Sequence, residues 1–371
     1  MSLVTPLLLL LAILRTPLFV VIALGAMLGF YGQGIDLSVI SIEIYRLAEM
    51  PVLIAIPLFT FAGYLLGKGN ASTRLVDLTN SLLGWMPGGL AIVSIIACAL
   101  FTAFTGASGI TIVALGGLLF TSLTRAGYSE KFNLGLLTSC GSLGLLFAPS
   151  LPLILYGVVA QQMDLPQGVR ISDLFLAGIL PGLLMLFMLS AQAMLQPRKA
   201  PPRESFDRTA ALAALRAAKW EIPLPFLVLG GIYGGYFALS EAAAVTAVYV
   251  LVVEVLIIRE IRVTDLPAIV RESMTLVGGI LIIIGVSLAS TNYLIDAQVP
   301  TRMFEFVQQH IDDKLTFLIL LNLFLLGLGM MLDIFSAIVI IVPIILPIAV
   351  GYGIHPVHLG IIFLANMQLG Y

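Results

Sequence analysis

Small polar residues gather at four places inside otherwise apolar runs of this sequence. The first two are Thr105 to Ser108 and Gly144 to Ser150, and the other two are Gly329 to Ser336 and Asn366 to Gly370. Hydroxyls and free backbone carbonyls attract Na⁺, while the N-terminal ends of helices favour anionic groups. Thus, if these runs cross a membrane, the four groups predict ion and substrate chemistry near its centre.

Asp333 is the charged residue inside one of these runs. A carboxylate within a membrane costs several kcal/mol to bury, so it is a functional candidate by default. The alternative is that Asp333 caps a helix at a turn. Glu241 and Glu254 are weaker candidates, because both are expected near helix ends.

Other chemistries lack the residues they need. The three histidines are expected in loops or at a helix start, which argues against a metal site, and no Gly-rich motif followed by Lys-Ser/Thr is present to bind ATP. Cys98 and Cys140 lie in apolar runs and are interpreted as packing residues. No Ser/His/Asp arrangement suggests an enzyme.

The composition sets the class of the protein. Of 371 residues, 60% are hydrophobic and 10% are charged, whereas a soluble globular chain is about one quarter charged. The net charge of −2 gives no nucleic-acid signal. The sequence therefore predicts an all-α polytopic membrane protein embedded in a lipid bilayer.

A broken helix is predicted from about 132 to 163. Two glycines and then Pro149 and Pro152 interrupt its apolar run, and proline removes the N–H that a helix interior needs. Unwound backbone at membrane depth is tolerated only where protein, water or a ligand satisfies it. An ordinary proline kink is the alternative.

Two re-entrant helical hairpins are predicted, at about 87–124 and 315–350. Each run has length for two short helices and a Gly- and hydroxyl-rich centre. Two full spans with an external turn are the alternative for the first. The start of a second broken helix is predicted at 357–371. The remaining segments are expected as membrane helices at 3–14, 16–31, 51–66, 174–195, 223–236, 242–258 and 277–290, with interfacial helices at 35–49, 73–83 and 265–272.

The order of these features recurs at an offset of about 225 residues, which predicts a structural duplication. The first repeat covers 1–197, a basic cytoplasmic connection covers 198–221, and the second repeat covers 222–371. Counting spans from the basic connection makes the two repeats inverted, with the N-terminus outside and Lys68 and Arg74 inside. The duplication also predicts about 50 further residues after Tyr371.

Six sequence motifs in order resemble the large membrane subunit of TRAP transporters, the tripartite ATP-independent periplasmic family. They are IPLFTFAGYLL (56–66), WMPGGLAIV (85–93), FTAFTGASGIT (101–111), GSLGLLFAPSLPLILYG (141–157), LFLAGILPGLL (174–184) and GGYFALSEAAAV (234–245). The resemblance implies an elevator-type carrier in the bacterial inner membrane, driven by Na⁺. It also implies a small four-helix membrane subunit, a periplasmic substrate-binding protein, and an organic acid substrate such as a C4-dicarboxylate, sialic acid, or a sugar or keto acid.

The same resemblance implies site residues. A first Na⁺ site would use backbone oxygens for the most part, and a second would use two glycines with further ligands beyond Tyr371. The substrate would lie between the hairpin tips. The implied residues are Thr105, Ser108, Gly144, Phe147 and Pro149 for the first ion, Gly329 and Gly370 for the second, and Ser108, Ser150, Asp333 and Asn366 for the substrate.

The sequence departs from the family pattern at both sites. Thr105, Ala107 and Gly109 stand in the turn where the family has Ser-Gly-Ser-Ser, which affects the hydroxyl ligands more than the backbone ones. The expected Thr-Pro-Pro turn after Gly370 is absent. A stand-alone carrier of the same architecture, needing no binding protein, is a second hypothesis, and a membrane scaffold or channel subunit is a third.

Overall fold

The computed structural model describes residues 6, 8, 10–11, 14, 16–86, 88–106, 108–163, 167–196 and 206–370. Within these ranges the chain is helical and contains no strand. Six of the described helices are long and apolar enough to cross a membrane, and a bent pair makes a seventh. The prediction of an all-α polytopic membrane protein is confirmed. The helix predicted at 3–14 lies largely outside the described residues.

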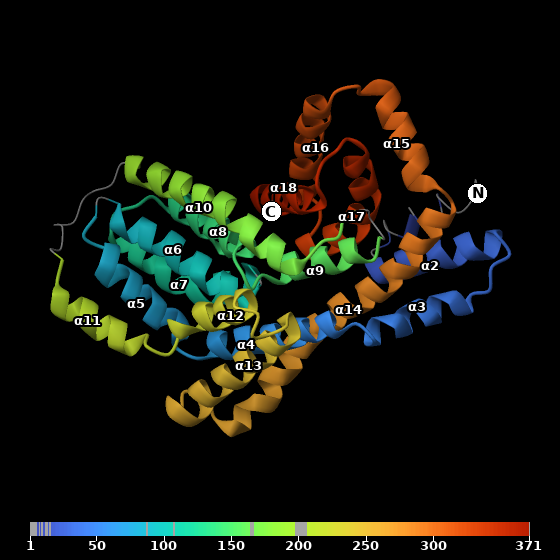
Figure 1. Ribbon diagram of the computed structural model, residues 1–371. Coiled ribbons are helices and arrows are strands. Elements are labelled where there is room, and N and C mark those ends of the chain that lie inside the picture. The colour runs from blue at the N-terminus through green and yellow to red at the C-terminus, as the bar shows by residue number, and fades with distance from the viewer. Residues whose placement is uncertain are drawn as a thin grey trace.

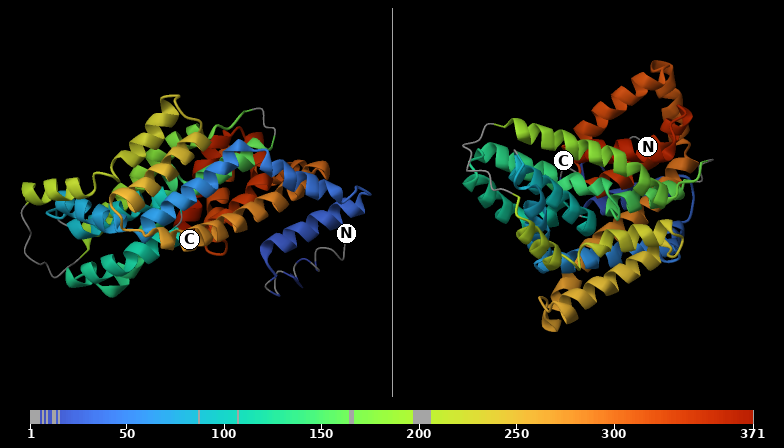
Figure 2. Two further views of the ribbon diagram at one scale, coloured as in Figure 1. Left: turned by 90° about the horizontal axis from the view of Figure 1, so that it is seen from below. Right: turned by 60° about the vertical axis from the view of Figure 1, so that its left-hand side comes forward.

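The molecule is elongated, with the N-terminal helices and the first hairpin at opposite ends (Figures 1 and 2). Helix α4 runs between these ends and continues from a short 3₁₀ turn, Pro51–Ile54. An amphipathic helix, α5, then leads toward the first hairpin. The bounds of this region are α2 Leu18–Gly32, α3 Ser38–Ala48, α4 Ala55–Lys68 and α5 Ala71–Leu83.

Two helices occupy the first predicted hairpin, α6 (Gly89–Thr105) and α7 (Ser108–Arg125). Gly106 ends α6 in the left-handed region, with φ of 66°, and its N–H donates to the Thr102 carbonyl over 2.7 Å. Glycine adopts this conformation without steric cost, so the chain can reverse within a very short turn. The two arms pack along each other.

The predicted broken helix is confirmed. It consists of α8 (Glu130–Leu143), a 3₁₀ turn (Gly144–Leu146) and α9 (Leu151–Gln161), with a bend of 46° between its halves. Ser150 caps the second half, because its hydroxyl accepts from the Leu153 N–H. A single straight span, α10 (Ile171–Leu195), packs beside both halves.

The connection between the proposed repeats is not wholly irregular. Residues 197–205 lie outside the described part of the chain, and α11 (Arg208–Ala217) follows them and packs on α5. Two further apolar helices come next, α12 (Pro223–Tyr233) and α13 (Leu239–Leu251). Helix α13 continues as a π-helical segment, Val252–Ile257, in which Glu254 is completely buried.

The separate helices predicted at 265–272 and 277–290 form one helix instead. Helix α14 (Leu266–Asp296) has 31 residues and runs unbroken across the molecule (Figure 1). The charges of Arg271 and Glu272 end the apolar run, but they do not interrupt backbone hydrogen bonding. Glu272 pairs instead with Lys68 at the end of α4, over 2.9 Å. The hydropathy pattern therefore predicted a helix boundary between 272 and 277 that the structure does not contain.

The second predicted hairpin has the same order of elements but a different packing. An amphipathic helix, α15 (Val299–His310), precedes α16 (Lys314–Gly329) and α17 (Ile334–Gly351), and α18 (Pro356–Gly370) follows. Helix α16 packs mainly against α18 and barely touches α17, which packs on α9 and α15. The arms of the second hairpin therefore splay apart, whereas those of the first lie together.

The buried core interlocks the two predicted repeats. One apolar cluster joins α9 to α14, α16, α17 and α18, and the other holds α5 to α8 against the ends of α4 and α13. Tyr156 of α9 is fully buried, donates its hydroxyl to the Pro356 carbonyl over 2.6 Å and lies against Gly360. The proposed repeats are therefore not independent folding units. Their boundaries at 197 and 222 stay predictions.

Candidate functional site

A buried group of threonines joins the first hairpin to the first helix break. Thr102 Oγ1 lies 2.7 Å from Thr111 Oγ1, 2.8 Å from the Cys98 carbonyl oxygen and 2.9 Å from the Gly141 carbonyl oxygen. Thr102 donates to Thr111, and because a hydroxyl has one proton, its three contacts share that single donor. Thr105 Oγ1 lies 3.4 Å from Thr111 Oγ1, and all three threonines are fully buried. Sequence reasoning missed Thr102, whose signal was its place one turn before Thr105.

Gly144 is where the backbone of the break touches the first hairpin. A Cβ atom at this position would meet the Ala99 carbonyl oxygen, and would lie 2.5 Å from both the Ala103 nitrogen and the Thr102 Cβ. These neighbours are backbone or branched atoms of α6 that cannot turn aside. Glycine therefore sets the close approach between the break and α6. The hairpin tip makes a similar contact, because a Cβ on Gly106 would lie 2.5 Å from Leu151.

The remaining residues of the first predicted ion site lie directly after this contact. Phe147 is extended and half-buried, and its N–H donates to the Gly144 carbonyl over 3.0 Å. Pro149 follows through a cis peptide bond with Ala148. Phe147 also packs on α10, where a Cβ on Gly182 would lie 2.7 Å from its ring. Of the predicted residues, Gly144 thus touches α6, Thr105 belongs to the threonine group, and the buried Ser108 begins α7. Phe147 and Pro149 follow Gly144 in the chain, and no contact with the hairpin is described for them.

The two glycines predicted for the second ion site are in backbone contact. A Cβ on Gly329 would lie 3.0 Å from the Met367 carbonyl oxygen and 3.1 Å from the Gly370 Cα. Asn366, one turn earlier in α18, donates to Asn322 Oδ1 over 2.5 Å and to the Ile362 carbonyl over 2.8 Å. Sequence reasoning missed Asn322, although an amide inside the apolar run of α16 was visible.

Asp333 is the N-cap of α17. Its Oδ1 accepts from the N–H groups of Phe335 and Ser336 over 3.0 and 2.9 Å, and its Oδ2 accepts from the Ser336 hydroxyl over 2.5 Å. The side chain is exposed and makes no contact with Asn366 among the described hydrogen bonds. The capping alternative thus has direct support in the geometry. A role for Asp333 in substrate binding stays a prediction.

The first helix break approaches the C-terminal end of α18. Ser142 in α8 lies with its Oγ 3.4 Å from the Gln368 carbonyl oxygen in α18. The Gln368 side chain is buried, and its Oε1 has no hydrogen-bond partner among the described residues. The ends of α8 and α18, distant in sequence, therefore share one polar region, which contains Asn366 and adjoins the first break.

The oxygen atoms gathered at the first break are of the kind that can ligate a hard monovalent cation. They are hydroxyl and carbonyl oxygens without a carboxylate, as expected from half-helix ends that coordinate Na⁺ in secondary transporters. Among the described residues, no group of three or more His, Cys, Asp or Glu side chains could hold a metal ion. An ion at the first break would therefore be held by neutral oxygens.

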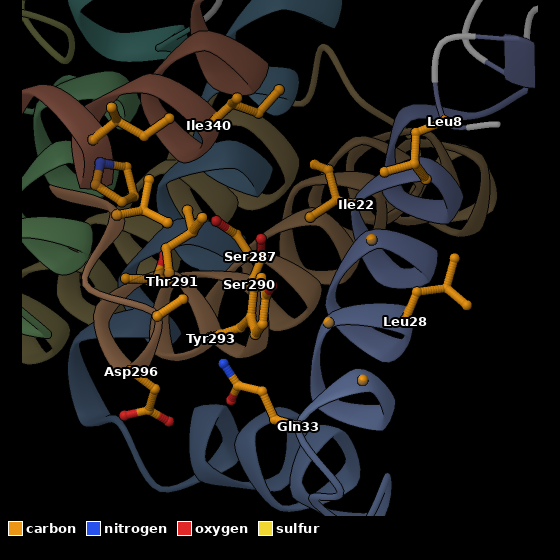
Figure 3. A pocket seen from close by; sticks show the side chains of 18 of the residues that line it. Leu8, Ile22, Leu28, Gln33, Ser287, Ser290, Thr291, Tyr293, Asp296 and Ile340 are labelled. Atoms are coloured by element: carbon orange, nitrogen blue, oxygen red, sulfur yellow. The ribbon is translucent and has the colours of Figure 1, made fainter. Parts of the chain in front are cut away.

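A large cavity lies elsewhere, between α2, α14 and α17. Its volume is about 980 Å³, and it contains none of the predicted site residues. Hydroxyls of Ser287, Ser290 and Thr291 line one side, and Leu28 and Ile22 of α2 line the other (Figure 3). Ser287 itself donates to the Val339 carbonyl of α17 over 2.7 Å. This hydroxyl is thus used to hold α14 to the second hairpin.

Comparison with known proteins gives consistent relatives. The family described as "Tripartite ATP-independent periplasmic transporter, DctM component" matches residues 5–371. The C4-dicarboxylate TRAP transporter large permease DctM of Pseudomonas aeruginosa is 33% identical over 89% of this chain and 76% of its own length. The ectoine/5-hydroxyectoine large permease UehC of Ruegeria pomeroyi is 30% identical over 97% and 84%. The isethionate permease DctMQ of Oleidesulfovibrio alaskensis is 33% identical over 90% and 52%.

A solved structure shows a similar fold. The Alcanivorax borkumensis YdaH transporter, described as having an unusual topology, superposes with a TM-score of 0.58. It is 14% identical in sequence, and the match covers 86% of this chain and 73% of that one. A likeness at this identity shows the fold alone. The family match over residues 5–371 and the permease relatives lead to one conclusion: the chain belongs to the DctM family of TRAP transporter large permeases.

Proposed function

We propose that this chain is the Na⁺-coupled large permease of a TRAP system and moves an organic acid anion by an elevator mechanism. The observation that carries the proposal is the buried contact of the first hairpin with the first break, where Thr102, Thr111, Gly141 and Gly144 gather hydroxyl and carbonyl oxygens. Such interrupted helices form the ion and substrate sites of secondary transporters. A continuous polar pore, which a channel would need, is not suggested by this arrangement.

The first Na⁺ would be held at Thr105, Ser108, Gly144, Phe147 and Pro149, mostly by backbone oxygens. Gly329 and Gly370 would contribute to the second ion site, in line with their direct contact. Carbonyl oxygens carry partial negative charge at helix ends, so they favour a cation without a buried carboxylate. Binding of Na⁺ would thereby hold the hairpin against the break.

The substrate anion would lie between the hairpin tips, near Ser108, Ser150, Asp333 and Asn366. Ser150 and Asn366 are buried side chains at or near helix ends, where amide and hydroxyl groups can donate to a carboxylate. The relatives are named for C4-dicarboxylate, isethionate and ectoine. Because these substrates differ, the family narrows the class of substrate but does not select one compound.

The partners follow from the family. A small membrane subunit and a periplasmic substrate-binding protein would complete the system, in the bacterial inner membrane, with the N-terminus on the periplasmic side. The basic segment 198–221 would then be cytoplasmic, as the distribution of Lys and Arg favours.

The experiment is uptake of radiolabelled organic acids into proteoliposomes containing this permease and its small subunit. An inward Na⁺ gradient and the binding protein are each supplied or omitted. We expect uptake only when both are present, and we expect Ser108→Ala to weaken its dependence on Na⁺. Uptake without a binding protein would instead indicate a stand-alone carrier, and unchanged Na⁺ dependence in Ser108→Ala would remove Ser108 from the ion site.

A further inference from the structure

One arginine contacts three glutamates in a mostly buried cluster beside α5. Arg74 of α5 contacts Glu221 before α12, Glu254 in the π-helical segment and Glu260 in the turn that follows it. The exposed fractions of these side chains are 13%, 2%, 0% and 20%. The cluster thus ties four separate parts of the chain together. None of its residues belongs to the ion and substrate sites proposed above.

The three carboxylates are not equivalent. Glu221 contacts two nitrogens of Arg74, because its Oε1 lies 2.7 Å from Nε and 2.5 Å from Nη2. Glu260 contacts Nη1 and also accepts the Asn70 N–H over 2.6 Å. Glu254 has a single contact, 3.2 Å from Nη2. The most deeply buried carboxylate therefore has the weakest partner.

The charges of the cluster do not balance. One guanidinium and three ionised carboxylates leave a net charge of −2 in a mostly buried place. Oε2 of Glu254 and Oε2 of Glu221 are buried without a hydrogen-bond partner among the described residues. A buried carboxylate that lacks a donor is strongly unfavourable, and such groups usually become neutral instead.

Among the described residues, no cation other than Arg74 pairs with Glu254, and Arg259 donates instead to the Leu256 carbonyl over 3.2 Å. Helix α12 has no charged residue, and Lys68 at the end of α4 is engaged with Glu272 of α14. A Cβ on Gly69 would lie 2.5 Å from Glu254 Oε2 and 3.2 Å from Glu260 Oε2, so both oxygens border the same space beside the chain. A hydrogen on Glu254 Oε2 would be well placed to face the Glu260 carboxylate.

We propose that this cluster is a proton-binding site, in which Glu254 carries the proton and Arg74 fastens α5 to the π-helical segment. The proton comes from water and forms one O–H bond on Glu254 Oε2, which lowers the net charge of the cluster to −1. Glu221 and Glu260 keep their contacts with the Arg74 guanidinium. Because α5 leads into the first hairpin, the site joins the start of that hairpin to α13.

The environment of Glu260 agrees with this division of roles. Burial by itself would raise the pKa of Glu260, but the Asn70 N–H and the Arg74 guanidinium together hold that pKa below its usual value. A carboxylate that accepts donors in this way keeps its charge. Of the three acids, Glu254 is therefore the group left to hold the proton.

The experiment is infrared spectroscopy of the purified chain, following the C=O stretch of protonated carboxyl groups as the pH is raised. We expect an acid band at neutral pH that disappears in Glu254→Gln and persists in the control Glu272→Gln, whose carboxylate is half exposed in a nearby ion pair. The samples contain N-methylglucamine as the only cation, and then Na⁺. A band that is lost in Na⁺ would overturn the proposal, because a metal cation would then neutralise the cluster.

The wild-type titration stands even if Glu254→Gln does not fold, since the lack of any acid band at neutral pH would also overturn the proposal. A band lost in Glu221→Gln but kept in Glu254→Gln would also overturn it.

The pH dependence of stability gives a second measurement. The folded chain holds a proton that the unfolded chain releases above the ordinary Glu pKa of about 4.3, so stability should fall as pH rises. One proton corresponds to about a tenfold change in the unfolding constant per pH unit, and Glu254→Gln should remove that slope.

Discussion

The first hairpin keeps the threonines near its tip in the interior, whereas the second places Asp333 at its surface. Thr102, Thr105 and Thr111 are fully buried between α6, α7 and α8, but Asp333 is exposed and Asn322 is half-buried. The arms of the first hairpin pack along each other, while those of the second splay apart. The same order of elements thus gives one closed polar group and one open group. We therefore expect changes in the first hairpin to cost more than equivalent changes in the second.

Gly144→Val should have the largest effect. The new side chain would collide with backbone atoms of α6, so the break could not approach the hairpin. We expect a loss of about 3 kcal/mol or more in stability, from overpacking of a backbone contact, and loss of uptake. The measurement is the melting temperature of the purified chain together with Na⁺-driven uptake.

Gly117→Ala is the matched control for that change, because nothing lies within 4 Å of a Cβ built at this position in α7. It should raise stability slightly, by about 0.5–1 kcal/mol, as alanine replaces glycine inside a helix. Equal damage from the two substitutions would show that the contact at Gly144 does not hold the first site closed.

Thr102→Val should have the next largest effect. Valine keeps the shape but removes the hydroxyl that links Thr111 with the Gly141 carbonyl. Loss of this buried link should cost about 2 kcal/mol and raise the Na⁺ concentration that gives half-maximal uptake. The control is Thr121→Val, since among the described residues the exposed Thr121 hydroxyl bonds to its own helix alone, at Gly117 and Leu118.

Asn322→Leu tests the second site by the same logic. It removes the acceptor of the Asn366 amide, but the pair is only partly buried, so we expect a loss of about 1 kcal/mol. A double-mutant cycle with Asn366→Leu measures the coupling between the two amides. A coupling free energy as large as that between Thr102 and Thr111 would contradict our expectation that changes in the more buried first hairpin cost more.

Asp333→Asn should have the smallest effect on stability. Asparagine caps helices about as well as aspartate, so the change should stay within about 0.5 kcal/mol, whereas Asp333→Ala should cost about 1 kcal/mol. If Asp333 also touches the substrate as proposed, the half-saturating substrate concentration will change in Asp333→Asn at an unchanged melting temperature. A change in neither quantity would leave Asp333 with the capping role alone.

Local features of the fold could be predicted from the sequence with good accuracy. The break at Gly144 to Ser150, the reversal at Gly106 and the cap at Asp333 each depend on a few neighbouring residues. Proline, glycine and short polar side chains act on the backbone within a turn or two, so their position in the sequence is enough. The error at 265–290 arose because charge was taken as the end of a helix that in fact continues as α14.

The sequence by itself determined the membrane class, the broken helix and the positions of the turns at Gly106 and Asp333. Tertiary structure alone decided that Thr102 meets Gly141, that Gly329 touches Gly370, and that Glu254 faces Arg74 across 180 positions. The physical reason is the separation along the chain over which each interaction acts. Helix breaks and caps follow from local backbone sterics and hydrogen bonding, whereas these contacts exist only after packed helices bring distant segments within a few ångströms of each other.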